Sequence, residues 1–293
     1  MILITGATGF VGRAVVQTLS RRHRLRCIVR DASQSSFSHP GVEVLEGSLT
    51  DASFVSLALR DVTVVVHLAS VLDPKDPQLH VVNVDGTKNL VTAARRSSVR
   101  HFIFLSTENV LYNCDDPYTA SKRAAETLVK QFQKHLILRE PIIYGPGDYR
   151  YIGKLISLLR RWPIVPIPGR GQWTFQPIFI DDLVAYIAEG IQRRITGVYT
   201  LAGKDAVSFL TLVSLLQREL HVSKPHIFIP LSLLRFIASC FTLIGLHPPL
   251  TSTQLTNLSS SRVISLRQQL SVFQHHPLSL REGIRRTLRA KSL

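Results

Sequence analysis

The chain has 293 residues, of which 45% are hydrophobic and 19% are charged, so it is long and apolar enough for a buried core and is not a disordered chain. The net charge of +15 favours an anionic partner: a phosphorylated cofactor, a nucleotide-linked substrate, nucleic acid or an anionic membrane. The basic residues are dispersed and no nucleic-acid-binding motif accompanies them, which argues against nucleic acid. Cys27, Cys114 and Cys240 lack metal-ligand spacing, so we expect no metal and a reducing, cytoplasmic compartment. Met1 leads directly into an apolar run, and no signal peptide is expected.

The first dozen residues carry a glycine motif. An apolar run ends at Thr5, and Gly6, Gly9 and Gly12 follow, three residues apart, before an amphipathic stretch at 13–20. Glycines in such a turn let the backbone pass close to a diphosphate, and the free N–H groups of the following helix bind its oxygens. The alternative is an ordinary strand–turn–helix corner. Because the motif opens a strand–helix unit, it predicts dinucleotide binding.

The first half of the chain alternates between strand and helix patterns. Predicted strands cover 25–29, 42–45, 62–68, 101–106 and 136–138, and predicted helices cover 82–94 and 117–132. Right-handed crossovers then give an α/β fold, a doubly wound parallel sheet with helices on both faces. Ligands bind outside the carboxyl ends of such strands, so the loops at Gly6, Arg30, Leu68 and Thr107 are the informative ones.

Arg30 stands at the end of the second predicted strand, 18 residues after Gly12. A carboxylate at this place accepts hydrogen bonds from the adenosine ribose of NAD, whereas a guanidinium suits a 2′-phosphate. Asp31 follows and is able to serve the ribose instead. The sequence therefore favours NADP(H), with NAD(H) as the alternative.

A second constellation joins Thr107, at a strand end, to Tyr118 and Lys122 on a helix. The four-residue spacing places Tyr118 and Lys122 on one helical face. A tyrosine has a pKa near ~10, and a neighbouring ammonium favours its phenolate. Tyr118 is then the acid/base, Lys122 lowers its pKa and Thr107 orients the substrate oxygen. The alternative is a surface helix pair without chemistry.

These segments resemble the extended short-chain dehydrogenase/reductase superfamily, in its NAD-dependent epimerase/dehydratase branch. The resemblance covers most of the chain and is carried by these segments: TGATGFVG from Thr5, GSLTD from Gly47, HLAS from His67, NVDGTKNL from Asn83, STENV from Ser106, Tyr118 with Lys122, REPIIYGPG from Arg139 and FQPIFIDDLV from Phe175. The fold it implies is a Rossmann domain with a smaller C-terminal substrate-binding lobe. Residues 1–145 and 176–202 would form the first, and 146–175 and 203–293 the second.

The resemblance also implies a cofactor site, residue by residue. The pyrophosphate would lie against Gly6, Gly9, Phe10, Val11 and Gly12. The remaining contacts would be Arg30 at the adenosine end; Ser48 and Leu49 beside the adenine; Leu68, Ala69 and Ser70 along the nicotinamide-side ribose; Lys122 on the ribose hydroxyls; and Pro141 near the nicotinamide. Thr107, Tyr118 and Lys122 match the catalytic triad, and Asn83 would support it.

Two positions depart from the family pattern. Ser48 stands where an aspartate usually meets the adenine amino group. Sugar dehydratases of the superfamily have Asp-Glu after the threonine, and here the pair is Glu108-Asn109. Asparagine cannot abstract a proton, so water elimination of that type is disfavoured. Redox at a secondary alcohol or ketone, or epimerisation through a transient ketone, remains.

The second half should form the substrate side. Five basic residues would face a substrate diphosphate or, alternatively, belong to a solvated loop: Arg150, Lys154, Arg160, Arg161 and Arg170. Trp173 would stack on a ring, and Asp181 or Asp182 would cap a helix over 183–191. The apolar segment 227–246 contains Pro230 and Arg235, which argues against a membrane span. It is expected to be a helix packed in the lobe or, alternatively, one lying at a membrane surface. The first substrate choice is a nucleotide sugar and the second is a sterol- or flavonoid-like ketone. The third interpretation is a non-catalytic NADP(H)-binding subunit, similar to the superfamily member attached to respiratory complex I. The superfamily resemblance also allows a homodimer.

Overall fold

A computed structural model describes residues 1–34, 37, 39–112, 116–243 and 262–290 of the chain. The chain divides into two compact units. The first contains Met1–Glu140, Ile180–Leu201 and Arg267–His276, and the second contains Pro141–Phe179, Ala202–Leu266 and Pro277–Leu293. The first unit thus combines three stretches that are separated in the sequence.

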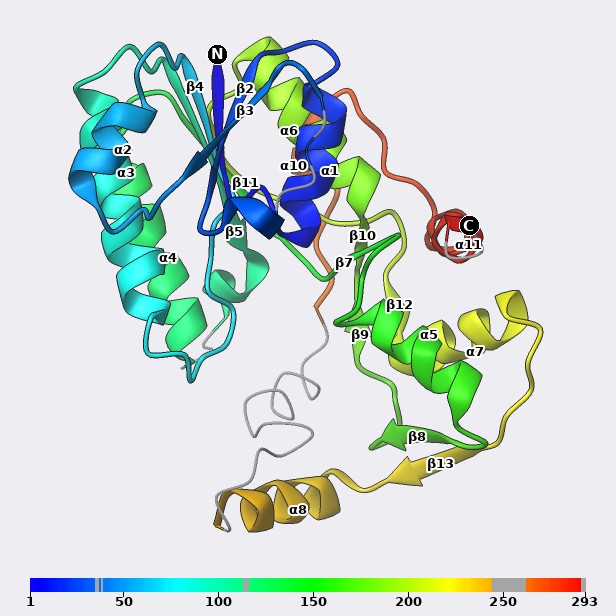
Figure 1. The fold of residues 1–293 in the computed structure, drawn as a ribbon. Coiled ribbons are helices and arrows are strands. Elements are labelled where there is room, and N and C mark those ends of the chain that lie inside the picture. The colour runs from blue at the N-terminus through cyan, green and yellow to red at the C-terminus, as the bar shows by residue number, and fades with distance from the viewer. Residues whose placement is uncertain (35–36, 38, 113–115, 244–261, 291–293) are drawn as a thin grey trace. The chain divides into compact units, whose positions relative to one another are not determined.

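The first unit is built on a seven-stranded sheet whose neighbouring strands are all parallel, in the order β11-β6-β5-β4-β1-β2-β3. Helices α1 and α6 cover one face, and α2, α3 and α4 cover the other (Figure 1). The expected doubly wound parallel sheet is thereby confirmed. The strands are β1 (Ile2–Thr5), β2 (Leu25–Val29), β3 (Val42–Glu46), β4 (Val64–His67), β5 (His101–Thr107), β6 (His135–Glu140) and β11 (Gly197–Thr200). The helices are α1 (Phe10–Leu19), α2 (Ala52–Ala58), α3 (Gly86–Arg95), α4 (Pro117–Val129), α6 (Ile180–Arg193) and α10 (Arg267–Val272).

The order of the strands determines where this sheet would bind a ligand. β1 is hydrogen-bonded to β2 on one side and to β4 on the other, so the chain reverses its direction across the sheet between β1 and β4. All seven residues of β5 and all four of β1 are buried, because helices cover both faces. The loops that follow β1 and β4 therefore emerge side by side at the carboxyl edge, where ligands bind in this architecture.

The second unit consists of short paired strands and helices. β7 (Ile143–Tyr144) pairs with β10 (Ile178–Phe179), β9 (Thr174–Phe175) with β12 (Val207–Ser208), and β8 (Val165–Pro168) with β13 (His226–Ile229). Its helices are α5 (Ile152–Arg161), α7 (Phe209–Glu219), α8 (Leu231–Leu243) and α11 (Leu280–Ala290). A Cβ at Gly283 of α11 would lie 2.1 Å from the Tyr144 hydroxyl, so glycine lets this helix approach β7.

Three elements differ from their sequence-based expectation. The helix expected at 82–94 begins with a π-helical turn, η2 (Val81–Asp85), which contains Asn83. Helix α6 begins at Ile180, so Asp181 and Asp182 lie in its first turn and the expected N-cap is wrong. Segment 227–246 forms most of β13 and then α8, separated by Pro230, and its last three residues lie outside the described residues. No helix in the described ranges has both the length and the apolar character needed to cross a bilayer.

Candidate active site

The glycine turn after β1 leaves no room for side chains. Gly6 has φ +70°, and a Cβ added to it would lie 2.6 Å from the Ala69 backbone nitrogen. At Gly12 the added atom would lie 2.1 Å from the Gly6 carbonyl oxygen. The turn and the loop after β4 are thus in direct contact, and both positions require glycine.

Helix α1 starts directly from this turn. The Gly9 N–H donates to the Gly6 carbonyl at 3.1 Å, and Arg13 donates the first helical bond to Gly9 at 2.9 Å. The N–H groups of Phe10, Val11 and Gly12 precede that bond, so they are the helix-end donors that bind phosphate oxygens. A close glycine turn that leads to such donors fits the diphosphate of a dinucleotide.

A chain of hydrogen bonds crosses the buried carboxyl edge of the sheet. The Ala69 N–H donates to Thr5 Oγ1 at 3.2 Å, and Thr5 Oγ1 is 2.6 Å from His67 Nδ1. On the other side of the ring, His67 Nε2 is 2.9 Å from Thr87 Oγ1, which donates to the Asn83 carbonyl at 2.6 Å. Since Thr87 donates its proton to Asn83, we assign the ring proton to Nε2 and leave Nδ1 to accept from Thr5. Burial and the nearby Lys122 charge lower the pKa of His67 to about 3, so its ring is neutral.

Asn83 connects the loop after β4 to helix α4. Its side-chain oxygen accepts from the Val71 N–H at 2.7 Å and from Ser70 Oγ at 3.2 Å. Its amide nitrogen donates to the Val71 carbonyl at 3.0 Å and to Ser121 Oγ at 2.9 Å. Ser121 immediately precedes Lys122. One buried amide therefore joins the loop that touches the glycine turn to the helix that carries Tyr118 and Lys122.

Lys122 lies against the end of β5, the strand that carries Thr107. Its side chain is 4% exposed, donates to the Leu105 carbonyl at 2.6 Å and lies 4.1 Å from the centre of the Phe104 ring. Thr107 is buried at the end of the same strand, where its hydroxyl accepts from the Asn109 N–H at 3.3 Å. Tyr118 is half-buried, one helical turn before Lys122. Burial lowers the pKa of Lys122 to about 8, while the charges of Glu140 and Glu126 oppose the shift.

Glu140 was not among the residues predicted for the site. Burial raises the pKa of its carboxyl to about 8, the Lys122 charge opposes the rise, and Glu108 adds to it. Its Oε2 is buried and has no hydrogen-bond partner among the described residues. The available signal was a charged residue at the carboxyl end of a parallel strand, in the segment Arg139-Glu140-Pro141. Burial in a low dielectric lowers the pKa of Lys122 and raises that of Glu140, so the two pKa values move toward each other.

The residues expected near the adenosine lie on the loops after β2 and β3. Arg30 is exposed directly after β2. Asp31 accepts from the Ser33 N–H at 2.9 Å, so one of its oxygens is used in the turn. Ser48 Oγ lies 2.8 Å from Thr50 Oγ1, and the carbonyl of the buried Leu49 accepts from Asn89 at 3.0 Å.

The remaining expected residues divide between the units. Leu68, Ala69 and Ser70 follow β4 and lie beside the glycine turn through the Ala69–Gly6 contact. Pro141 is the first residue of the second unit and directly follows β6. No group of His, Cys, Asp and Glu suited to a metal ion occurs among the residues that the structure describes.

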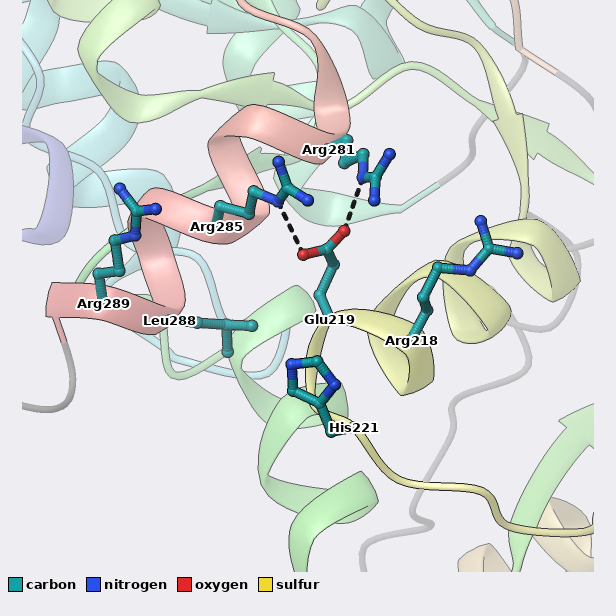
Figure 2. Close-up of a pocket in the computed structure, with 7 residues that line it drawn as sticks. All are labelled: Arg218, Glu219, His221, Arg281, Arg285, Leu288 and Arg289. Carbon is teal, nitrogen blue, oxygen red and sulfur yellow. Dashed lines mark hydrogen bonds and ion pairs between the residues drawn. The ribbon is translucent and has the colours of Figure 1, made fainter.

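A separate pocket of about 480 Å³ lies in the second unit, and none of its lining residues was predicted for the site (Figure 2). Glu219 at the end of α7 accepts from Arg281 at 2.7 Å and from Arg285 at 2.8 Å, both on α11. Its pKa is lowered by these two hydrogen bonds. The pocket is a surface hollow between two helices joined by ion pairs.

Comparison with known proteins gives the family. The model of the NAD-dependent epimerase/dehydratase family matches residues 2–201. A ceramide reductase of Caulobacter vibrioides is 31% identical over 206 residues, which cover 69% of this chain and 64% of that enzyme, so the chain spans less than two thirds of this relative's length. A UDP-glucose 4-epimerase of Vibrio cholerae is 26% identical over 99% of this chain and 94% of its own.

A solved structure supports the same fold. The UDP-glucuronic acid 4-epimerase of Bacillus cereus, in complex with UDP-glucuronic acid and NAD, aligns with a TM-score of 0.80, 22% identity and coverage of 99% of both chains. The family model covers the glycine turn, the Asn83 link and the Tyr118–Lys122 helix, and continues through β11. The chain therefore belongs to the NAD-dependent epimerase/dehydratase family.

Proposed function

We propose that the chain catalyses reversible hydride transfer at a secondary alcohol or ketone, with Tyr118 as acid/base. The proposal rests on the hydrogen bonds of the Asn83 side chain. It bonds Val71, in the loop that touches the glycine turn, and Ser121, the residue before Lys122 in the sequence. A cofactor held at the glycine turn and a substrate oxygen held at Tyr118 would then belong to one rigid site. When bound, the nicotinamide cofactor supplies or accepts the hydride.

Tyr118 and Lys122 of α4, together with Thr107 of β5, would move the proton and hold the substrate oxygen. Tyr118 gives its hydroxyl proton to the substrate oxygen during reduction and takes it back during oxidation. The Lys122 ammonium, anchored on the Leu105 carbonyl, favours the phenolate of Tyr118. Thr107 holds the same oxygen in place. Asn109 offers no carboxylate for water elimination, which supports redox or epimerisation over dehydration.

A Tyr118→Phe variant tests this chemistry. It is expected to lose about 10²- to 10⁴-fold in kcat while still binding the cofactor. Tyr199→Phe is the matched control, because that phenol donates to the Thr196 carbonyl at 3.0 Å at the edge of the sheet. Turnover that is equal in the two variants would remove Tyr118 from the mechanism.

For the cofactor we propose NADP(H), because Arg30 is exposed at the end of β2 and one Asp31 oxygen is used by Ser33. An Arg30→Ser variant is expected to lose about 10- to 100-fold in NADPH affinity and little in NADH affinity. Arg24→Ser, also exposed at the other end of β2, is the control. Wild-type protein that binds NADH as tightly as NADPH would refute the assignment.

The proposed substrate is a nucleotide sugar. The second unit has 15 Lys and Arg against 4 Asp and Glu, a formal +11 of the chain's +15. An excess of this size suits a diphosphate, and arginine forks bind phosphate oxygens well. The five basic residues singled out between 150 and 170 are all exposed, whereas Trp173 stacks on Phe209 with ring centres 4.9 Å apart, so one face of its ring is already covered.

A hydrophobic ketone is the second candidate. Large apolar side chains are exposed on β13 and α8 of the second unit, and the ceramide reductase relative acts, by its name, on a lipid. Nucleotide sugars are assayed by chromatography of the sugar product, because epimerisation consumes no net cofactor, and long-chain ketones by NADPH consumption; the two assays together separate the candidates. Turnover restricted to lipophilic ketones would replace the first choice by the second.

A further inference from the structure

Large apolar side chains are exposed together in one part of the second unit. Trp162 and Ile164 precede β8, Ile227 and Phe228 lie on β13, and Leu233 and Phe236 lie on α8. β8 pairs with β13 in register from Val165 with His226 to Pro168 with Ile229, and β13 leads through Pro230 into α8 (Figure 1). We call these six residues the β13–α8 surface. Trp162 is 53% exposed, Phe228 52% and Phe236 67%.

This exposure does not follow from ordinary amphipathic packing. Successive residues of a strand point to opposite faces, yet Ile227 and Phe228 are both exposed. Helix α8 has a single charged residue, Arg235, in the sequence LSLLRFIASCFTL. Water-facing helices normally carry a polar face. Helices that lie in a membrane interface combine an apolar face with a cationic one, and α8 supplies only Arg235, so further cations have to come from neighbouring segments of the second unit.

The start of α8 is attached to the lobe. Gly169, in the turn after β8, has φ +55°, and a Cβ there would lie 3.3 Å from Leu231 Cγ. The Lys224 ammonium, just before β13, donates to the Trp162 carbonyl. The six apolar side chains are therefore presented by a connected piece of the second unit. At 13 residues α8 extends about 20 Å, which suits a helix lying along a bilayer surface.

The two segments that carry this surface contain charges of one sign only. Residues 149–179 and 220–266, which contain all six apolar side chains, have no Asp or Glu. Arg160 and Arg161 are exposed directly before Trp162, and Arg235 is exposed on α8 between Leu233 and Phe236. Exposed apolar side chains bordered by cations, without a neighbouring acid in either segment, are complementary to anionic lipid head groups above an acyl layer.

We propose that the β13–α8 surface docks on a bilayer that contains anionic lipid. The exposed side chains of α8 and of one face of β13 enter the interface, and the cations contact the head groups. The proposal goes beyond the hydride-transfer chemistry and does not depend on it, since docking is measured without substrate or cofactor.

Sedimentation of the full chain with lipid vesicles tests the proposal. The protein is expected to bind vesicles of two-thirds phosphatidylcholine and one-third phosphatidylglycerol, and to bind pure phosphatidylcholine weakly. Phe236→Ser is expected to weaken binding by roughly tenfold. Leu233→Ser and Leu57→Ser form a matched pair, because both leucines are 47% exposed and only Leu233 lies on the proposed surface. Only the first of the pair should weaken binding.

A second pair tests the charges. Arg160→Glu with Arg161→Glu should weaken binding to the anionic vesicles, whereas Arg21→Glu with Arg22→Glu, exposed on the first unit, should not. No binding to anionic vesicles, or equal loss in on-surface and off-surface variants, overturns the proposal, the latter because it indicates diffuse attraction of a basic protein. A wild-type dimer that Phe236→Ser turns into a monomer also overturns it, since a second copy then covers the surface.

Discussion

Replacing Gly12 by alanine should damage dinucleotide binding while leaving the protein folded. The added Cβ would lie 2.1 Å from the Gly6 carbonyl oxygen, more than 1 Å inside ordinary contact, and 2.8 Å from the Ala7 backbone. Relieving such an overlap moves the first turn of α1 away from Gly6 and typically costs about 1–3 kcal/mol. A domain with about 5–15 kcal/mol of stability still folds. The displaced N–H groups, however, no longer face a diphosphate, and loss of one charge-assisted hydrogen bond corresponds to about 10- to 100-fold in affinity.

The assay is fluorescence titration with NADPH and NADH, together with thermal unfolding of each variant. Gly41→Ala is the control, because its Cβ would meet its nearest neighbour at 3.5 Å, an ordinary contact. Gly9→Ala, at 3.3 Å from the Gly6 oxygen, should give a small effect, and Gly6→Ala a large one from both overlap and positive φ. A folded Gly12→Ala protein with wild-type affinity for both dinucleotides would refute the reasoning.

Three further predictions concern the buried polar groups. Burial holds the pKa of His67 near 3, against about 6.5 in the unfolded chain, so acid protonates the unfolded chain first. Between pH 7.5 and pH 5 this one group should therefore cost about 2 kcal/mol of stability. Denaturant unfolding of His67→Gln should lack that component, and parallel pH curves for the two proteins would contradict it. Glu126→Gln should cost about 3 kcal/mol in the same unfolding assay, because Arg139 loses the carboxylate that accepts two of its hydrogen bonds. Glu282→Gln, in the exposed pair with Arg286, should change stability by less than about 0.5 kcal/mol. Equal effects would show that the burial of the ion pair does not affect its contribution. Asn83→Ala removes four side-chain hydrogen bonds and should speed hydrogen exchange at residues 69–75 without a matching increase in α1, and an unchanged exchange rate would show that Asn83 does not hold the loop.

Much of the first unit was predictable because its elements are locally specified. The strand predicted at 25–29 has the observed bounds, since an apolar run between polar neighbours reads as a buried parallel strand. The glycine spacing also predicted the tight turn, because φ +70° at Gly6 suits few other residues. The spacing of Tyr118 and Lys122 predicted a shared helix, which α4 provides.

The rest depends on contacts that sequence patterns do not carry. No local sequence signal distinguishes the π-helical turn of Asn83 from a regular helix start, and the bonds of Asn83 to Val71 and Ser121 join residues that are distant in the sequence. The burial of Glu140 Oε2 depends on the folded sheet, so no local sequence pattern predicts it. The site residues themselves remain predictions, and so do the cofactor preference and the substrate.

The first unit is discontinuous, and this shapes how the chain reaches its native state. β11 pairs with β6 along Leu136 to Arg139, and α10 adds a buried Gln269 that donates to the Tyr186 hydroxyl. During synthesis, a nascent chain that ends at residue 140 therefore leaves the outer strand of the sheet without its neighbour, and edge strands of this kind attract other chains. Expression of 1–140 alone is expected to yield an aggregating fragment. The first unit is therefore completed only after residues 180–201 and 267–276 have been synthesised.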